Sequence, residues 1–441
     1  MNRTSVYSRS YRRYVGVLLT IVYVFNQLDR MVFNILMEPI KHEFSLTDTQ
    51  LGFLAGPAQV LIYACLGIVV ARWADRHRRI AIMTVAIILW SAMAALTATA
   101  HDFWQLVLVR VGVGVGEAGF SAVALSVIGD YASDKDRTRA LASFALAMPI
   151  ASLIGDSMGG WVNELYGWRL VFILAGAPGI LLALLMRMTV QEPPRRVSTS
   201  SDGSGRASLP LVLSTLWRRR SLRHLMIGQA LANIVVTSMS WISVLFIRQH
   251  GMSTGELGSW FAVTDVVGGM GGIWLSGFLV SRYGAKDAGM KARLMAYAAV
   301  LAAPLAIFVL WCPFKHAALL GFLLLNVPVL FFIAPTYALV QDLVGANMRA
   351  TMAAVFTLTQ MLAGGVIGTQ LVGLLSDALA PIAGNSTLSL RWGMAIGSML
   401  TLGAALNFWL AARFVRQDLS EPATAVTSHS LPPTRETYVH P

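Results

Sequence analysis

The residues IAIMTVAIILWSAMAALTATA, from Ile80 to Ala100, contain no charged side chain and decide the class of fold. An α-helix needs about 20 consecutive apolar residues to cross a hydrocarbon core roughly 30 Å thick. This stretch meets that requirement, and about twelve stretches along the chain do so. The sequence therefore predicts a polytopic membrane protein.

The composition supports this prediction. Of the 441 residues, 56% are hydrophobic and 13% are charged, whereas a soluble domain carries about 25% charged residues. A barrel would alternate in polarity over strands of about ten residues, which these runs do not do. We predict an all-α protein, because helices satisfy their own backbone polar groups in lipid. The expected transmembrane helices are 14–37, 50–71, 80–99, 103–128, 139–161, 169–190, 223–246, 257–280, 292–311, 317–340, 351–375 and 392–414.

The net charge of +12 is explained by topology. Most of the Lys and Arg residues lie in loops on the side of the N-terminus. By the positive-inside rule both termini are then cytoplasmic, in what we expect to be a bacterial inner membrane. Basic loops facing anionic lipid account for the charge, so we expect no nucleic-acid partner. The exceptions are Arg30 and Arg110, deep in helices, and Lys41, Arg169, Arg248, Lys315 and Arg391, on the opposite loops.

The hydrophobic pattern is interrupted once, between residues 191 and 222. This segment holds Glu192-Pro193-Pro194-Arg195-Arg196, a Ser/Gly-rich stretch and Trp217-Arg218-Arg219-Arg220, as in a cytoplasmic linker. The predicted organisation is a cytoplasmic N-terminus (1–13), an N-terminal six-helix bundle (14–190), this linker, a C-terminal six-helix bundle (223–415) and a disordered tail (416–441).

The two predicted bundles resemble each other. Several features recur about 206 to 212 positions later, which indicates duplication and predicts a site between two similar halves near the membrane midplane. The pairs are Ser45-Leu46-Thr47 with Gly251-Met252-Ser253, Leu51-Gly52 with Leu257-Gly258, Arg76 with Arg282, and Asp130 and Arg137 with Asp342 and Arg349.

Three motifs resemble those of the major facilitator superfamily. Residues 71–79, ARWADRHRR, are similar to its loop between helices 2 and 3, and residues 277–284 form a second copy with Ser281 in the Asp position. Residues 155–160, GDSMGG, resemble its helix 5 motif, with Asp156 replacing proline. The resemblance covers residues 14 to about 415. It implies twelve transmembrane helices in two pseudo-symmetric bundles.

Within that superfamily the chain resembles the Spinster-like group, whose animal members move sphingosine phosphate and lysolipids. The resemblance is carried by Leu28-Asp29-Arg30, by Arg110 with the string GVGEA at 114–118, and by Glu192-Pro193-Pro194-Arg195. It implies a lipid-like substrate.

Four ionisable residues lie inside predicted helices, where such groups usually mark functional sites. Asp29 and Arg30 lie in the first helix, and Arg110 and Glu117 lie in the fourth. A rise of about 1.5 Å per residue places Asp29 and Arg110 at nearly the same depth, so we expect them to meet. Glu117 lies about 10 Å further along its helix than Arg110, so these two residues cannot form a simple adjacent pair.

Our hypothesis is that Asp29 and Glu117 bind protons and that Arg30 and Arg110 are their partners or bind an anionic substrate group. Desolvation raises the pKa of a carboxyl group and a nearby arginine lowers it, so changing the pairing would couple protonation to conformation. Two alternatives remain. The four residues could form a static ion network that holds the bundle together, or only one acid could titrate.

A second group of charges lies on the predicted cytoplasmic side. Asp75 and Arg76 are interpreted as part of a cytoplasmic gate, in which Asp75 would cap the helix beginning near Arg349. Asp130, Arg137 and Arg139 would join this network. The alternative is that these are solvated loop charges, and we favour that interpretation for Arg78, Arg79 and residues 217–220.

In the second half Asp265 is the most conspicuous acid, and it has no obvious basic partner. A cavity charged on the first side and apolar on the second would suit an amphipathic substrate. The other possible lining residues, for which hydrogen bonding between helices is the alternative where they are neutral, are Asp156, Asn233, Trp241, Asn326, Tyr337, Thr357 and Gln360.

The leading hypothesis is a monomeric, proton-coupled transporter working by alternating access, with an amphipathic small molecule, protons and membrane lipids as partners. We expect no cofactor or metal, because Cys65 and Cys312 lack a ligand-like spacing and no phosphate-binding loop is present. The alternatives are a drug exporter, an organic-anion symporter or, less favoured, a membrane enzyme acting on lipids, for which the histidines form no cluster.

Overall fold

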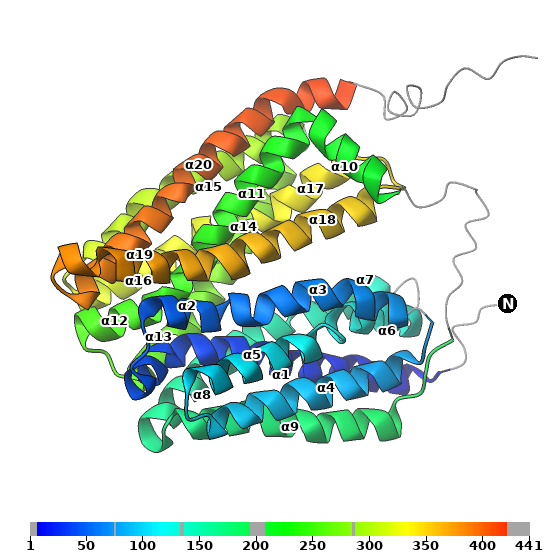
Figure 1. The fold of residues 1–441 in the computed structure, drawn as a ribbon. Coiled ribbons are helices and arrows are strands. Elements are labelled where there is room, and N and C mark those ends of the chain that lie inside the picture. The colour runs from blue at the N-terminus through cyan, green and yellow to red at the C-terminus, as the bar shows by residue number, and fades with distance from the viewer. Residues whose placement is uncertain (1–6, 75, 133–135, 195–207, 285–286, 421–441) are drawn as a thin grey trace, which may run out of the picture.

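The computed structural model describes residues 7–74, 76–132, 136–194, 208–284 and 287–420, and within these ranges it contains helices and turns but no strand (Figure 1). The all-α prediction is confirmed. In lipid this is the expected outcome, because an α-helix pairs its backbone N–H and C=O groups internally.

In its described residues, the first half comprises nine α-helices and one short 3₁₀ turn, η2 (Thr97–Thr99). Several predicted spans consist of two consecutive helices separated by a bend. The helices are α1 (Arg9–Phe44), α2 (Asp48–Ala55), α3 (Pro57–Ala74), α4 (Arg79–Leu96), α5 (Phe103–Glu117), α6 (Ser121–Tyr131), α7 (Arg137–Ala145), α8 (Ala147–Tyr166) and α9 (Trp168–Thr189).

The second half has a similar layout after a linker helix, α10 (Leu209–Arg218). Two of its spans contain π-helical segments, η4 (Asp265–Gly269) and η5 (Ala363–Gly368), and one contains a 3₁₀ turn, η3 (Met239–Trp241). The helices are α11 (Arg220–Ser238), α12 (Ile242–His250), α13 (Thr254–Thr264), α14 (Met270–Tyr283), α15 (Ala288–Trp311), α16 (Lys315–Leu330), α17 (Ile333–Leu343), α18 (Arg349–Leu362), α19 (Thr369–Ala383) and α20 (Ser386–Ser420).

Among the described residues, 11 helices are long and apolar enough to cross a membrane. The predicted span 103–128 is not among them, because it divides into α5 and α6. A tight turn separates the two, in which Gly119 donates to the carbonyl of Gly116 and Phe120 donates to that of Glu117. Glycine weakens a helix interior, and three glycines lie at or just before this turn. The prediction of one continuous helix is therefore wrong at 118–120.

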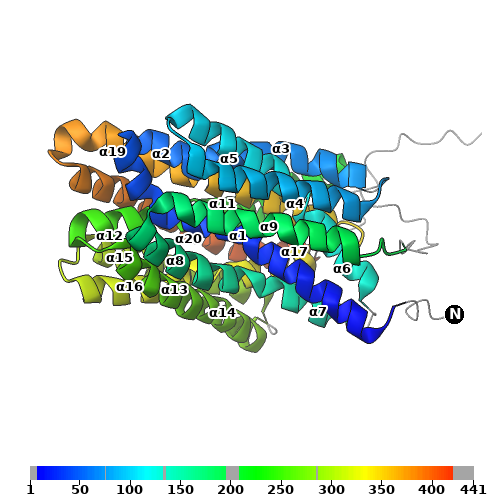
Figure 2. The same cartoon turned by 90° about the horizontal axis from the view of Figure 1, so that it is seen from below.

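The two halves lie side by side as two bundles in Figure 1. In the view from below, where the bundles overlap, the long helices of both run in roughly the same direction (Figure 2). We call the end that carries the start of α1 and the end of α20 the terminal end, and the opposite end, with the turns at 45–47 and 251–253, the far end. At the far end α8 packs against α13 and α2 packs against α19. Figure 1 shows the bundles converging there and diverging toward the terminal end.

Two helices extend beyond the predicted spans at the terminal end. In the linker, α10 buries Val212 and Leu216 against the second half. At the end of the chain, α20 continues to Ser420, past the predicted boundary at 415. Asp418 is buried there and accepts a hydrogen bond from the backbone N–H of Ser221 at 2.8 Å, so it caps the start of α11.

Candidate functional site

Two ion pairs connect α1 to α5 inside the first half. The guanidinium group of Arg110 lies 2.5 Å from the carboxylate of Asp29, and that of Arg30 lies 2.6 Å from the carboxylate of Glu117. Adjacent residues on a helix point about 100° apart, so Asp29 and Arg30 reach different positions on α5. The predicted contact between Asp29 and Arg110 is present, and Glu117 has a separate partner, as its spacing required.

The Asp29–Arg110 pair is enclosed by protein. The two side chains are 2% and 1% exposed. Arg110 also donates to the carbonyl of Leu54 at 3.2 Å, and its guanidinium lies 4.0 Å from the centre of the Phe33 ring. It therefore links α1, α2 and α5.

The Arg30–Glu117 pair is more open. Glu117 is 1% exposed, whereas the Arg30 side chain is 34% exposed. Glu117 is also the last residue of α5, at the break in the fourth span. Its Oε1 atom is buried and has no hydrogen-bond partner among the described residues. The side chain of Gln59 is the neighbouring polar group. This carboxyl group keeps one oxygen without a well-formed hydrogen bond, beside a cation that is accessible from outside the bundle.

A second acidic site joins the two halves. Asp156 on α8 is buried, and Asp265 opens the π-helical segment η4 of the second half. The hydroxyl of Ser152 donates to Asp156 at 2.8 Å and lies 3.3 Å from Asp265, and Asn326 lies 3.4 Å from Asp265. The two acids and Asn326 were predicted separately, and Ser152 was not predicted, although its place one turn before Asp156 was the available signal.

The remaining polar residues predicted for the second half form hydrogen bonds between helices. Asn233 on α11 donates to the carbonyl of Gln360 on α18 at 2.5 Å. The hydroxyl of Tyr337 on α17 lies 3.0 Å from that of Thr357 and 3.4 Å from the Gln360 side chain. Trp241 is different, because it is fully buried and donates to the carbonyl of Thr369 at 2.9 Å. It is a packing residue and not a cavity-lining one.

The far end is held by contacts across the halves that sequence analysis did not find. Arg248 of the second half binds the Glu38 carboxylate through two nitrogens, at 2.8 and 2.9 Å, and the Asp48 carboxylate at 2.9 Å. Lys41 also contacts Asp48. One indication was available, because Arg248 was predicted to lie on the outer side, which carries few other charges.

Two acids also cap helices of the opposite half. Asp377, in the second half of α19, accepts hydrogen bonds from the backbone of Asp48 and Thr49, at 3.1 and 2.7 Å. Glu164 at the end of α8 accepts from the hydroxyl of Ser253 at 2.7 Å and from the backbone of Gly255 at 2.9 Å. Carboxylates at helix N-termini are favourable because free N–H groups and the helix dipole point at them.

The predicted cytoplasmic gate is not assembled among the described residues. Asp75 lies outside them, and Asp130 pairs with Arg79 at 2.5 Å. Among the described residues, no hydrogen bond or ion pair is seen between Asp130 and the start of α18, and the N-cap residue Met348 makes no side-chain cap. Exposed side chains that form no ion pair with a described residue belong to Arg76, Arg137, Arg139 and Arg349.

Two arginines that we interpreted as solvated are buried. Arg79 is 5% exposed and binds Glu192 at 3.2 Å in addition to Asp130, because the chain after α9 returns beside the start of α4. Arg219 is 8% exposed and donates to the carbonyl of Leu343. The solvated interpretation is wrong for these two, while Arg78 and residues 217, 218 and 220 are exposed.

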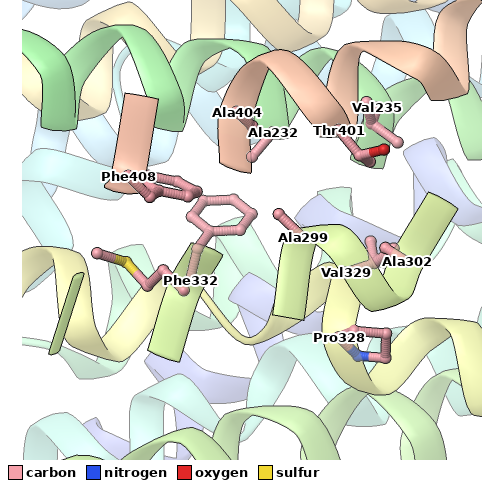
Figure 3. A pocket seen from close by; sticks show the side chains of 11 residues that line it. Ala232, Val235, Ala299, Ala302, Pro328, Val329, Phe332, Thr401, Ala404 and Phe408 are labelled. Atoms are coloured by element: carbon pink, nitrogen blue, oxygen red, sulfur yellow. The ribbon is translucent and has the colours of Figure 1, made fainter. Parts of the chain in front are cut away.

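A small pocket lies within the second half, between α11, α15, α16 and α20 (Figure 3). Its lining is apolar apart from Thr401, whose hydroxyl donates to the carbonyl of Ser398 at 2.6 Å. It offers no charged or free polar group to a ligand and lies inside one bundle, so we interpret it as a packing gap.

Residues 19–369 match the family model described as Major Facilitator Superfamily. The chain belongs to the major facilitator superfamily. It is therefore an integral membrane transporter for a small-molecule substrate, and the two bundles are the two halves of that fold.

Relatives refine this assignment. The transporter is 30% identical to an MFS-type efflux pump of Mycolicibacterium smegmatis over 93% of this chain and 94% of that protein. It is 24% identical to the sphingosine-1-phosphate transporter SPNS2 of Danio rerio over 93% and 86%. It also resembles the crystal structure of a bacterial homolog of the human lysosomal transporter Spinster in an inward-facing and unoccupied conformation. That match has a TM-score of 0.86, 27% identity and coverage of 95% of this chain and all of the other. The predicted similarity to Spinster-like transporters is confirmed.

Proposed function

We propose that this transporter moves an amphipathic, lipid-like substrate of the sphingolipid or lysolipid class by proton-coupled alternating access. Glu117 and Asp29 are its proton-responsive acids, with Arg30 and Arg110 as partners. The observation that carries the proposal is the state of Glu117, a buried carboxylate with one unbonded oxygen beside a partly exposed guanidinium.

The coupling follows from competition for Arg30. A substrate with an anionic group that binds Arg30 withdraws the cation from Glu117, and an unpaired carboxylate in an apolar site takes up a proton. The reverse exchange releases the proton when Arg30 returns to Glu117. Asp29 is enclosed with Arg110. We therefore assign it a change of protonation that requires movement of α1 against α5.

The contacts at the far end define the conformational change that transport requires. The halves are closed there by Arg248 and by the two cross-half caps, while they diverge at the terminal end. With both termini in the cytoplasm of a bacterium, this arrangement corresponds to an inward-facing state. Transport then requires the far-end contacts to break and the predicted gate at the terminal end to form.

The second candidate is an exporter of lipophilic drugs, which is favoured by the similarity to an efflux pump over nearly the whole length of both chains. The two candidates share the proton chemistry and differ in the substrate. An anionic head group would need Arg30, whereas a cationic drug would be repelled by it and would bind a carboxylate instead.

The test is substrate movement in proteoliposomes with and without a pH gradient. The panel contains lysophospholipids, sphingosine phosphate, cationic drugs and a hexuronate, and the variants are Arg30→Gln and, as a control, Arg78→Gln on the exposed loop. The proposal predicts pH-driven movement of an anionic lipid that Arg30→Gln abolishes and Arg78→Gln does not. Movement of only a cationic drug would support the exporter, and movement of only the hexuronate would contradict both.

A further inference from the structure

A pair of carboxyl groups lies across the contact between the two halves. Asp156 comes from α8 of the first half and is 4% exposed, and Asp265 comes from the second half. The hydroxyl of Ser152 lies within 3.3 Å of both carboxylates. A hydroxyl group has one hydrogen to donate, so Ser152 satisfies only one of them at a time.

In the described part of the chain, no cation balances this pair. Asn326 approaches Asp265 with its amide group, at 3.4 Å, and no Lys, Arg or His among the described residues is within ion-pair distance of either acid. The ionisable groups on the elements packed around the pair are engaged elsewhere or lie toward the helix ends. They include Asp29, Arg30, Glu38, Lys41 and Glu43 on α1, Arg137 and Arg139 on α7, Glu164 on α8, Arg169 and Arg187 on α9, Glu256 on α13, Arg282 on α14, and Lys315 and His316 on α16.

The backbone holds the two acids close together. Gly258 on α13 packs against the main-chain carbonyl of Asp156, and a Cβ atom at this position would clash with that oxygen. Gly160 packs in the same way against the carbonyl of Thr254. The carboxyl groups therefore cannot move far apart while α8 and α13 stay in contact.

We propose that Asp156 and Asp265 bind one proton between them when the halves meet at this point, and that this proton is released when the halves separate. Asp156 is buried and Asp265 is partly buried. Two such carboxylates without a cation repel each other, whereas a carboxylic acid beside a carboxylate forms a charge-assisted hydrogen bond. Separation exposes both groups to water, where both ionise. One proton is thus taken from water on closure of the far end and returned on its opening.

This inference rests on the alternating access of the proposed function but names a different acid pair from Asp29 and Glu117. It makes closure of the far end itself dependent on pH, even without substrate. The α8–α13 contact would then act as a second proton site, formed by both halves together and lost when they part.

The experiment measures the distance between the halves at the far end as pH is varied. Spin labels replace the exposed residues Trp104 and Phe314, one in each half, after Cys65→Ser and Cys312→Ala. The protein is placed in lipid nanodiscs from pH 5 to pH 9 without substrate. For a single exchanged proton the closed-to-open ratio should fall by about tenfold per pH unit through the transition.

Asp156→Asn and Asp265→Asn should each abolish this pH dependence and keep the far end closed, because an asparagine amide donates to the remaining carboxylate without a proton. Asp287 pairs with Arg416 at the terminal end, at 3.1 Å, so Asp287→Asn is the control that should keep the pH dependence. Size-exclusion profiles establish folding, and Asp265→Asn alone is sufficient if Asp156→Asn does not fold.

Three outcomes would overturn the inference. They are the absence of any pH dependence in the wild type, its persistence in the folded asparagine variants at positions 156 and 265, and its loss in Asp287→Asn. The third outcome would not contradict the proposed function. Conversely, loss of pH dependence in the asparagine variants supports this inference even if no lipid is transported.

Discussion

Glu164 of the first half accepts a hydrogen bond from the backbone of Gly255 in the second half at 2.9 Å, and so caps a helix of the opposite bundle. The relationship between Asp377 and Thr49 repeats this contact in the other direction, at 2.7 Å. The capped helices begin after Thr47 and Ser253, which are related by the internal repeat. The duplication therefore produces two equivalent capping contacts between the halves at the far end.

Removing one of these capping contacts should favour opening of the far end. A cap is worth about 1 kcal/mol, so Glu164→Ala is expected to shift the closed-to-open ratio roughly fivefold toward the open form. Labelling of a far-end cysteine by a membrane-impermeant maleimide measures the shift. The matched control is Glu256→Ala, since Glu256 binds Lys315 within the second half at 2.6 Å. Equal labelling of the two variants would contradict the assignment.

Close packing of α8 on α13 gives a second prediction. In Gly258→Ala the new methyl group would meet the Asp156 carbonyl, so the helices must separate and the far end should label faster. Gly271→Ala lies on the same span with no atom within 4 Å of the added Cβ, and it should behave as wild type. Slow labelling of both variants would show that this contact does not limit opening.

Arg248 should be the most important single cation at the far end. Arg248→Ala leaves Glu38 and Asp48 without their main partner, and breaking a buried pair costs about 3–5 kcal/mol. Lys41 still contacts Asp48, so we expect the lower end of that range. Denaturant unfolding in detergent measures the loss. Arg169→Ala, which breaks an exposed pair with Glu43, should cost at most about 1 kcal/mol. A similar loss in both variants would contradict this account.

The two ion pairs of the first half should differ in their effect on stability. Arg110→Ala strands Asp29 in an enclosed site and should lower the unfolding free energy by about 3 kcal/mol or more. Adding Asp29→Asn should restore part of that loss. Glu117→Gln leaves Arg30 partly exposed to solvent and should unfold much like the wild type. Equal destabilisation by Arg110→Ala and Glu117→Gln would instead support the static-network alternative.

Hydrophobic run length and internal repeats predicted most of the fold, because lipid imposes helices wherever an apolar run is long enough. The break after Glu117 was not predictable from hydropathy, since the glycines that permit it are also common in unbroken packed helices. The meeting of Asp29 with Arg110 was predictable because depth along two helices can be counted from the sequence.

The partners in the cross-half contacts could not be predicted. Glu164, Asp377 and Ser152 carry no motif, and their role depends on how two bundles are placed against each other. The buried state of Arg79 was missed for a similar reason, because its partner Glu192 lies more than a hundred residues away and reaches it only after α9 folds back.

The most direct test of the central claim is the proton movement that accompanies transport of the lipid identified in proteoliposomes, compared in the wild type and Glu117→Gln. The account predicts that Glu117→Gln still exchanges labelled for unlabelled lipid but moves no protons with it. Proton flux that persists in Glu117→Gln at the wild-type ratio to substrate would contradict the assignment of Glu117 as the coupling acid.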